Sequence, residues 1–201
     1  MEKPFFLVLE GIDGSGKTTL ISKLSESLQK NGIPVDQYFE PTKRDTGLRI
    51  RQFLSGEISL NPEEQIEAFI EDRKESVKYH IIPSLQKGNS VLLDRYYYST
   101  AAYQGNEKIT PQEILNRNIK EGFPSPDYLF FLDVSPEESI RRIAQRNESR
   151  EVFEKKEILE KIYSNFSMIL PETCIRIPES FKTEDSVNLI LRKIGIKAKE
   201  S

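Results

Sequence analysis

A glycine-rich segment near the start of the chain has the residues of a phosphate-binding loop. Gly11, Gly16, Lys17 and Thr18 fit the pattern G-x-x-x-x-G-K-[ST], and the segment lies between the apolar run FFLVLE and a helical pattern, as this motif requires. Glycines let backbone N–H groups turn toward phosphate oxygens, the lysine reaches the outer phosphates, and the hydroxyl can bind Mg²⁺. We therefore predict that a nucleoside triphosphate binds with Mg²⁺ through this P-loop, which comprises Gly11, Ile12, Asp13, Gly14, Ser15, Gly16, Lys17 and Thr18.

One residue of the P-loop, Asp13, has the wrong charge for a phosphate site. A carboxylate that faced the phosphates would repel them, so we expect the side chain to face away from the bound triphosphate. The alternative is a turn-forming role, because aspartate is common in turns and Gly14 follows it directly.

A second charged pair follows another apolar run. Asp94 and Arg95 come at the end of the run VLLD, and a parallel sheet would bring the end of this strand beside the P-loop. An arginine suits a phosphate because it is always charged and donates parallel hydrogen bonds. The alternative for these two residues is an ordinary surface ion pair.

The apolar runs predict the elements that must hold these residues. FFLVL, VLL and YLFFLDV are almost continuously apolar, as expected for strands of a parallel sheet that is covered on both faces. Strands that alternate with helices predict an α/β fold with right-handed crossovers, in which ligands gather at the carboxyl ends of the strands. We predict strands at 5–9, 90–93, 128–134 and 173–177 with a weaker one at 35–39, and helices at 17–30, 61–86, 136–145, 155–170 and 183–194.

Composition restricts the class of protein. The chain has 201 residues, which suits a single domain over 1–201. Its net charge of −3 argues against a broad nucleic-acid surface. No apolar run approaches the ~20 residues that cross a bilayer, so we expect a cytoplasmic protein without a membrane partner. The single cysteine, Cys174, agrees with a reducing compartment, and together with the single histidine, His80, it leaves little material for a zinc site.

Five segments together resemble one enzyme family. EGIDGSGKTT, FEPT, AFIEDR, DRYYYSTAAYQG and FLDVSPEESIRR occur in the order and at the separations that are typical of the thymidylate (dTMP) kinases. The resemblance implies a P-loop NTPase three-layer sandwich, in which a five-stranded parallel sheet is flanked by helices and a short lid. It also implies transfer of a phosphoryl group from Mg²⁺-ATP to dTMP for dTTP synthesis, and a homodimer.

The resemblance gives roles to residues around an acceptor site. Phe69 and Arg73 lie four apart and share a helix face; in the family the aromatic ring stacks on thymine and the arginine binds its carbonyl edge. Thr100, Tyr103 and Gln104 follow the Asp-Arg-Tyr turn, on what we expect to be a short helix. Thr100 matches the residue that reads the base, and Tyr103 the one that fills the space of a ribose 2′-hydroxyl. Asp13 would face the acceptor and meet its 3′-hydroxyl or the arginine on its phosphate. The residues implied in dTMP binding are Asp13, Phe69, Arg73, Arg95, Thr100, Tyr103 and Gln104.

Other assignments concern the metal and the acceptor phosphate. Asp94 resembles the residue that holds Mg²⁺ through water, next to Thr18, and Arg95 the arginine that grips the acceptor phosphate. Two simpler interpretations stay open for the acceptor site. Phe69 alone could be a core residue, and Ser99 and Gln104 could equally lie on a helix surface.

Arginines gather after the fourth predicted strand, in RRIAQRNESREVFE. We expect a lid at about 146–154 that closes over the donor phosphates and brings positive charge to the transferring phosphoryl group. Arg142 would contact ATP, and solvated charge at a helix end is the alternative for each arginine. The residues expected to act in catalysis are Lys17, Asp94, Arg95, Arg146 and Arg150.

The chain departs from the family pattern at two places. Relatives often have Asp-Arg in the lid where this chain has Glu151 and Val152, which would give the role of the lid arginine to Arg150. Many relatives have a basic residue just before the EP segment, where this chain has Phe39. The phosphate contact expected there is then either missing or supplied by Arg44, Arg49 or Arg51.

Three other functions can be weighed against this one. A deoxynucleoside kinase would phosphorylate a neutral hydroxyl and need a general base, for which Glu40 is the candidate. Another (deoxy)nucleoside monophosphate kinase would share most of the site. A GTP-dependent switch would need an N-K-x-D segment, which the sequence lacks. The arginines expected around the site, Arg95 and those of the lid, favour an anionic acceptor. Such an acceptor needs positioning and charge neutralisation instead of a general base.

Overall fold

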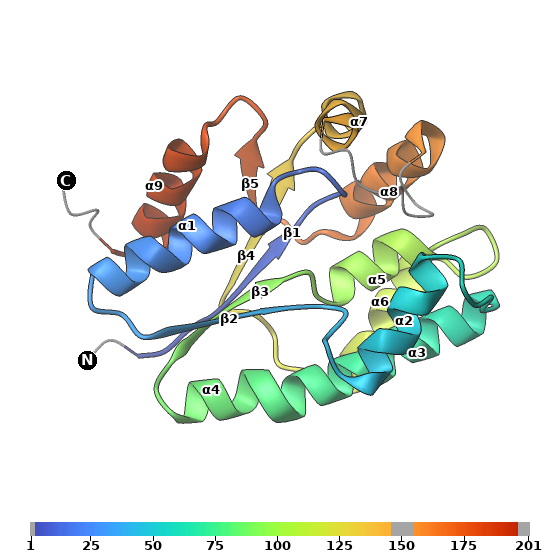
Figure 1. Cartoon of the computed structure of the whole chain (residues 1–201), viewed down its shortest axis with the longest axis horizontal. Helices are drawn as coiled ribbons and strands as arrows, with labels where there is room; N and C mark the ends of the chain where they lie inside the picture. Colours follow the sequence, from blue (N-terminus) through green and yellow to red (C-terminus); the bar gives the residue numbers. More distant parts are fainter. Residues whose placement is uncertain (1–2, 146–154, 197–201) are drawn as a thin grey trace.

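The computed structural model describes residues 3–145 and 155–196. Within them, five parallel strands form one sheet in the order β2-β3-β1-β4-β5 (Figure 1). The predicted parallel α/β fold is confirmed, and strand ends differ from the prediction by one or two residues. β5 begins later than predicted because the chain turns just before it, where the N–H of Cys174 donates to the Pro171 carbonyl oxygen. The strands are β1 (Phe6–Glu10), β2 (Val35–Phe39), β3 (Ser90–Asp94), β4 (Tyr128–Asp133) and β5 (Ile175–Pro178).

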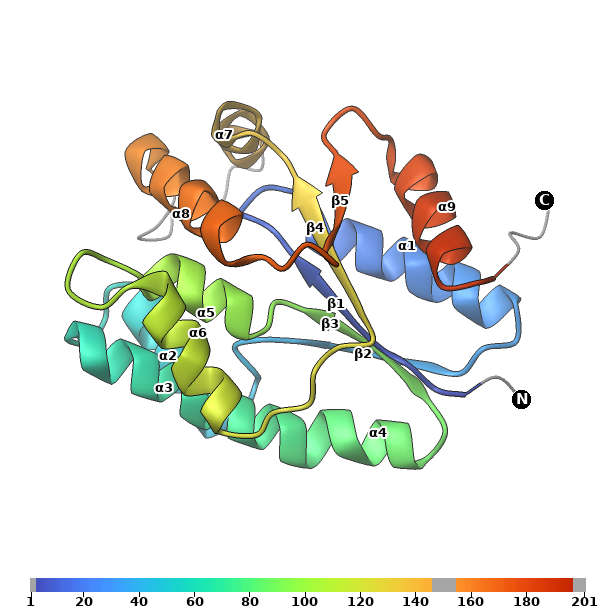
Figure 2. The same cartoon turned by 180° about the vertical axis from the view of Figure 1, so that it is seen from behind.

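Helices cover both faces of the sheet and make it the middle of three layers (Figures 1 and 2). Alternate residues of β1 belong to two separate cores: Leu7 and Leu9 pack in one, Phe6 and Val8 in the other. This explains why the strand sequence is continuously apolar. The first core is closed by α1 (Lys17–Lys30) and α9 (Thr183–Lys193), and the second by α3 (Pro62–Ser76), α5 (Tyr97–Gln104), α6 (Pro111–Lys120) and α8 (Lys156–Ile169).

The long helix predicted at 61–86 has a change of winding in its middle. α3 begins with a capping box between Asn61 and Glu64, continues into a π-helical turn, η1 (Val77–Ile81), and ends as α4 (Ile82–Gln86). Pro83 explains the change, because proline has no N–H to donate and its ring crowds the carbonyl four residues earlier. The wider π turn accommodates that ring, and the periodicity of the sequence alone did not predict it.

Two helices were not predicted. α6 begins with a second capping box between Thr110 and Glu113, with Pro111 between them, so the sequence did carry its signal. α2 (Asp45–Leu54) is a short helix with weaker signals. It lies against the chain that follows β2, where a Cβ on Gly47 would come within 1.9 Å of the Thr42 carbonyl oxygen. Only glycine permits this close approach.

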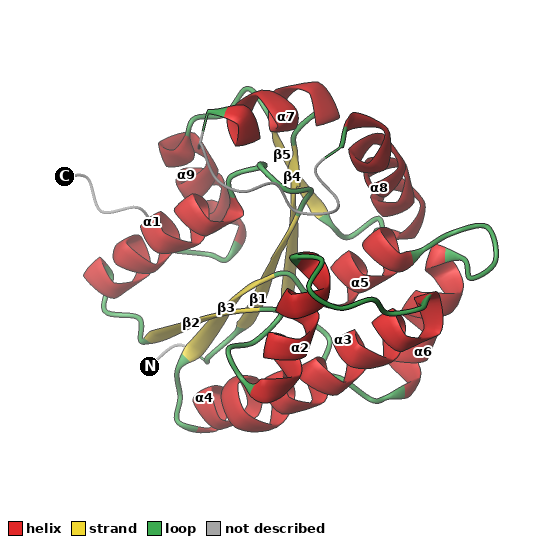
Figure 3. Ribbon diagram, turned by 45° about the vertical axis from the view of Figure 1, so that its right-hand side comes forward, coloured by secondary structure: helices red, strands yellow, loops and turns green. Residues whose placement is uncertain are grey.

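The carboxyl ends of the strands meet at one edge of the sheet. Leu9 pairs with Asp94 on one side and with Phe130 on the other, so the loops after β1, β3 and β4 begin side by side. α7 (Pro136–Ala144) follows β4 at this edge, above the P-loop (Figure 3). In residues 3–145 and 155–196, no helix is both long and apolar enough to cross a membrane.

Candidate active site

The P-loop joins β1 to α1 and leaves the start of that helix open. α3, α7 and α9 have acidic residues in their first turns, whereas α1 begins with Lys17 and Thr18 and has none. Its N-cap, Gly16, has a φ of 99°, which favours glycine, and supplies no capping side chain. The first N–H groups of α1 are therefore available to an anion.

Lys17 folds back over the loop. Its buried ammonium donates to the carbonyl oxygens of Gly11 and Ile12, both at 2.9 Å, and to the hydroxyl of Ser15 at 3.3 Å. Burial lowers the pKa of Lys17 to about 8, with a smaller contribution from Arg95. The side chain is thus held at the loop and is still mostly protonated at neutral pH.

Thr18 and Asp94 meet across the gap between α1 and β3. The threonine hydroxyl donates to Asp94 Oδ2 at 3.1 Å. The other carboxylate oxygen, Oδ1, is buried without a hydrogen-bond partner in the described residues. Carboxylate and hydroxyl oxygens suit Mg²⁺, which usually keeps several waters and takes one or two protein ligands together with substrate phosphates. Residues 3–145 and 155–196 contain no cluster of three or more acidic, histidine or cysteine side chains that could hold a metal by themselves.

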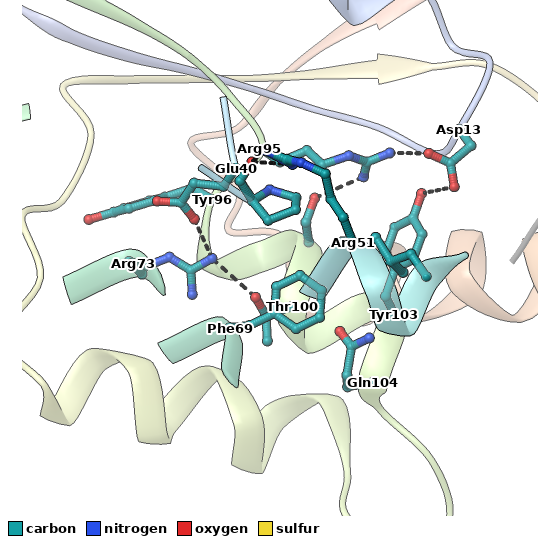
Figure 4. Close-up of a pocket in the computed structure, with 13 residues that line it drawn as sticks. Asp13, Glu40, Arg51, Phe69, Arg73, Arg95, Tyr96, Thr100, Tyr103 and Gln104 are labelled. Carbon is teal, nitrogen blue, oxygen red and sulfur yellow. Dashed lines mark hydrogen bonds and ion pairs between the residues drawn. The ribbon is translucent and has the colours of Figure 1, made fainter. Parts of the chain in front are cut away.

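Arg95 stands at the turn between β3 and α5. Its φ of 69° is in the left-handed region, which is unusual for a residue other than glycine. The guanidinium donates to the Gly11 carbonyl oxygen at 3.3 Å and to the Ser99 hydroxyl at 3.2 Å, and it forms an ion pair with Asp13. The other carboxylate oxygen of Asp13 accepts from the Tyr103 hydroxyl at 3.0 Å (Figure 4). The side chain of Asp13 therefore points toward α5, away from the start of α1.

A pocket of about 230 Å³ opens on this side of the P-loop. Every residue that the resemblance implied in dTMP binding lines it, although these residues come from the P-loop, α3, the turn after β3 and α5 (Figure 4). Phe69 is half-buried at the pocket wall and is not one of the fully buried core residues of the described chain. The full lining is Asp13, Glu40, Pro41, Arg51, Leu54, Phe69, Arg73, Arg95, Tyr96, Ser99, Thr100, Tyr103 and Gln104.

Arg73 is the most deeply buried charge of this pocket, at 1% exposure. It forms a 2.6 Å ion pair with Glu40, and it donates to Asn118 Oδ1 at 2.6 Å and to the Thr100 hydroxyl at 3.1 Å. Burial raises the pKa of Glu40, and the charge of Arg73 opposes that rise. Sequence reasoning did not identify Asn118 on α6, because this helix was not predicted.

Gln104 is 5% exposed and points into the same pocket (Figure 4). Neither its amide oxygen nor its amide nitrogen has a hydrogen-bond partner in the described residues. Ser99 is also buried, so the interpretation of these two residues as helix-surface residues is wrong. A buried amide without partners is costly unless a ligand supplies them.

A second pocket, of about 340 Å³, lies on the other side of the P-loop. Arg142 from α7 reaches it and donates to the Ser15 carbonyl oxygen at 3.2 Å, while Glu138 fixes it through a 2.6 Å ion pair. Hydrogen bonds from Arg141 and Arg142 lower the pKa of Glu138 to about 2. The P-loop thus separates two pockets, and the second is lined by Gly14, Ser15, Gly16, Thr19, Leu20, Leu132, Arg142, Gln145, Phe181, Thr183 and Ser186.

Residues 9–190 match the family model described as thymidylate kinase. The chain belongs to the thymidylate kinase family. It is 51% identical to the thymidylate kinase of Leptospira borgpetersenii serovar Hardjo-bovis over 177 residues, and these residues are 88% of this chain and 86% of the relative. The thymidylate kinase of Desulfotalea psychrophila is 40% identical over 164 residues, which are 81% of this chain and 80% of the relative. The probable thymidylate kinase of Archaeoglobus fulgidus is 36% identical over 188 residues, which are 94% of this chain and 93% of the relative.

The departure from the thymidylate kinase pattern at Phe39 can be followed in the structure. Of the three arginines considered as substitutes, Arg51 lines the first pocket, where it donates to the Pro41 and Thr42 carbonyl oxygens. Arg44 instead pairs with Glu75 at 2.6 Å, and Arg49 is exposed. Of these three arginines, Arg51 is the one that lines the first pocket.

Some predicted residues lie outside the described part of the chain, and some residues of the second pocket were not predicted. Arg146, Arg150, Glu151 and Val152 lie outside the described residues, as does the lid expected at 146–154. Seven residues of the second pocket were not among the predicted site residues: Thr19, Leu20, Leu132, Gln145, Phe181, Thr183 and Ser186. Phe181, Thr183 and Ser186 belong to α9 and the segment before it, where the sequence shows only an ordinary helix start.

Proposed function

We propose that this protein transfers the γ-phosphoryl group of ATP to the phosphate of dTMP, which gives dTDP and ADP for dTTP synthesis. The observation that carries the proposal is the first pocket, which combines two kinds of recognition beside the P-loop. Arg95 provides a cation next to the P-loop, and Phe69 and Gln104 provide an aromatic wall and a free amide farther in. The end beside Arg95 suits a phosphate group, and the end with Phe69 and Gln104 suits a nucleobase. Membership of the thymidylate kinase family supports dTMP as the acceptor.

Recognition of thymine would use the buried polar groups of α5 and α3. A thymine edge offers both a donor and acceptors, and Gln104 offers both an acceptor and a donor without partners in the described residues. Arg73 holds the Thr100 hydroxyl at 3.1 Å, which fixes a second polar group at the same wall. Phe69 would stack on the ring, and Tyr103, held by Asp13 at 3.0 Å, would occupy the space of a 2′-hydroxyl.

ATP would bind on the other side of the P-loop. The N–H groups at the start of α1 and the Lys17 ammonium would hold its phosphates, and Arg142 would line the nucleotide pocket. Thr18 and Asp94 would hold Mg²⁺, in agreement with the unpartnered Oδ1 of Asp94. Bound Mg²⁺ would neutralise charge on the β- and γ-phosphates. Arg146 and Arg150 would complete the site from the lid.

An anionic acceptor fits the site better than a neutral hydroxyl does. Phosphate oxygens need no deprotonation, so positioning by Arg95 and charge neutralisation by Lys17 would suffice. A deoxynucleoside kinase would instead need Glu40 as a free general base. One oxygen of Glu40 is held in a buried 2.6 Å ion pair with Arg73, which ties this carboxylate to the pocket wall.

The decisive experiment is an enzyme-linked ADP-release assay with dTMP, dUMP, dGMP and thymidine as acceptors. We expect turnover with dTMP, less with dUMP, and none with thymidine. Turnover with thymidine but not with dTMP would show that the protein is a nucleoside kinase.

A matched pair of variants in α2 tests the acceptor pocket. Arg51 lines it and Arg49 is exposed on the same helix. We expect Arg51→Ala to raise the KM for dTMP about tenfold, because a hydrogen bond to a charged group contributes about 1.5–3 kcal/mol. Arg49→Ala should leave this KM unchanged, and equal effects of the two variants would contradict the assignment.

The family resemblance also supports a homodimer and a single catalytic domain over 1–201. Sedimentation velocity at micromolar concentration would test the homodimer, and a monomer at that concentration would contradict it.

A further inference from the structure

Glu10, the last residue of β1, is a buried carboxylate with no assigned role. It is 0% exposed and lies directly before the P-loop. It is not among the described residues that line either pocket, so it does not face a substrate. Burial raises the pKa of Glu10 to about 7. A neutral side chain would be cheaper to bury here, so the carboxylate needs another explanation.

The carboxylate caps a helix that lies far away in the sequence. Oε1 of Glu10 accepts hydrogen bonds from the backbone N–H groups of Tyr96 at 2.9 Å and Ser99 at 3.2 Å, which are the N-cap and a first-turn residue of α5. The N-cap residue of α5, Tyr96, has no side-chain cap of its own. Glu10 therefore satisfies the Tyr96 N–H at a buried helix start, and it shares the Ser99 N–H with the Tyr96 carbonyl oxygen at 3.0 Å.

The second oxygen of Glu10 sets the direction of a hydroxyl. Ser99 donates its hydroxyl proton to Glu10 Oε2, so the oxygen of Ser99 is left to accept a hydrogen bond, and Arg95 Nη1 donates to it at 3.2 Å. The backbone N–H of Arg95 is held as well, by the Leu9 carbonyl oxygen at 3.0 Å. An ordered chain thus runs from the buried carboxylate through the hydroxyl to the guanidinium.

We propose that Glu10 is a positioning residue for the acceptor phosphate: through Ser99 it holds the Arg95 guanidinium at the P-loop in the orientation that receives the phosphate of dTMP. This inference rests on the proposed function. Glu10 acts only through the hydroxyl and the helix start. Its effect should therefore appear with acceptors that carry a phosphate and be absent with those that do not.

The test is Glu10→Gln, with binding of dTMP and thymidine measured by calorimetry at about pH 8, above the pKa of Glu10, where its side chain is a carboxylate. The glutamine oxygen can still accept the two backbone N–H groups. Its NH₂ group, however, donates to Ser99 and turns the hydroxyl proton toward Arg95, which is itself a donor. We expect about a tenfold weaker dTMP affinity, since hydrogen bonds to charged groups are the strong ones. The affinity for thymidine and the KM for ATP should change less than about twofold on the same reasoning.

Ser99→Ala provides a second, independent variant. It keeps both backbone hydrogen bonds to Glu10 and removes the hydroxyl, so it should produce the same selective loss of dTMP affinity. The double variant should be no worse than either single variant, because both break the same chain.

The outcomes separate the inference from the proposed function. If the unmodified protein binds thymidine as tightly as dTMP, the proposed function fails. If it prefers dTMP, and the variants weaken both ligands equally or neither, Glu10 has only a structural role and the inference is overturned.

Discussion

Replacing Gln104 with leucine should make the protein more stable and a poorer binder of dTMP. The side chain is 5% exposed, and both of its polar amide atoms lack a partner in the described residues. Folding therefore removes this amide from water without compensation. Leucine has a similar volume and no polar atoms, so it fills the same space without that cost.

The expected magnitudes follow from the two amide atoms. A buried polar group without a partner costs about 1–3 kcal/mol, so the variant should gain about 1–2 kcal/mol in free energy of unfolding after imperfect packing. At roughly 2–4 °C per kcal/mol for a chain of this size, the Tm should rise by about 2–8 °C. If thymine pairs with both amide atoms, losing two hydrogen bonds should weaken dTMP binding by about tenfold to a hundredfold.

Thermal unfolding without ligand and calorimetry with dTMP measure the two effects in one preparation. Gln65→Leu is the matched control, because the Gln65 amide donates to the Leu60 carbonyl oxygen at 2.9 Å, outside the pocket. It should lower the Tm and leave dTMP affinity unchanged. A Gln104→Leu variant with a lower Tm and normal dTMP affinity would refute the reasoning, because Gln104 would then have a structural partner.

Four further predictions follow from the same geometry. Lys17→Ala should abolish ADP release at saturating ATP, and near-normal turnover would disprove its catalytic role. Tyr103→Ala should allow turnover of ribothymidine monophosphate, whereas Tyr103→Phe, which keeps the ring, should still exclude it. Asp72→Ala should lower the free energy of unfolding, measured by urea denaturation, by about 2–4 kcal/mol. The substitution removes the acceptor of three hydrogen bonds, from the Thr42 N–H (2.7 Å), the Thr42 hydroxyl (2.6 Å) and the Thr46 hydroxyl (2.8 Å). Glu10 has a folded-state pKa raised from 4.5 to about 7, so between these pH values the folded state keeps a proton that the unfolded chain has lost. Its contribution to the free energy of unfolding should therefore fall on the order of 3 kcal/mol as pH rises through this range. The measurement is the difference in free energy of unfolding between the unmodified protein and Glu10→Gln, and a difference that stays constant with pH would contradict the shift.

The sheet could be predicted from the sequence because its signal is local. Residues 6–9 alternate between two cores, so the whole run must be apolar, and the same holds for β3 and β4. The π turn at 77–81 could not be predicted from periodicity, since it depends on how the chain accommodates Pro83. α2 was missed because its place is set by contact with the segment after β2, including the close approach at Gly47.

The residues of the site likewise divide into those that the sequence could predict and those that it could not. The P-loop is contiguous, so its residues and their chemistry could be read directly from the sequence. Residues on other elements were placed by resemblance, and the structure brings them to one pocket. What escaped prediction are partners that are remote in sequence: Asn118 is 45 residues from Arg73, and Ser99 is 89 residues from Glu10. No spacing rule reaches across such separations, because only the crossovers of the sheet bring these residues together.

The carboxylate in the P-loop follows from this arrangement of two pockets. Its side chain bridges Arg95 and Tyr103 on the acceptor side, while the Asp13 carbonyl oxygen accepts from Ser139 of α7 on the nucleotide side. Gly14 presses the loop against the same helix, where an added Cβ would come within 2.7 Å of the Ser139 carbonyl oxygen. One short loop is therefore tied to the walls of both pockets. Since in-line transfer requires the reacting atoms to approach to about 3–3.5 Å, a single rigid loop that fixes both substrates against each other reduces the error in that distance. The carboxylate of Asp13 therefore faces the first pocket, on the side of the loop away from the open N–H groups at the start of α1.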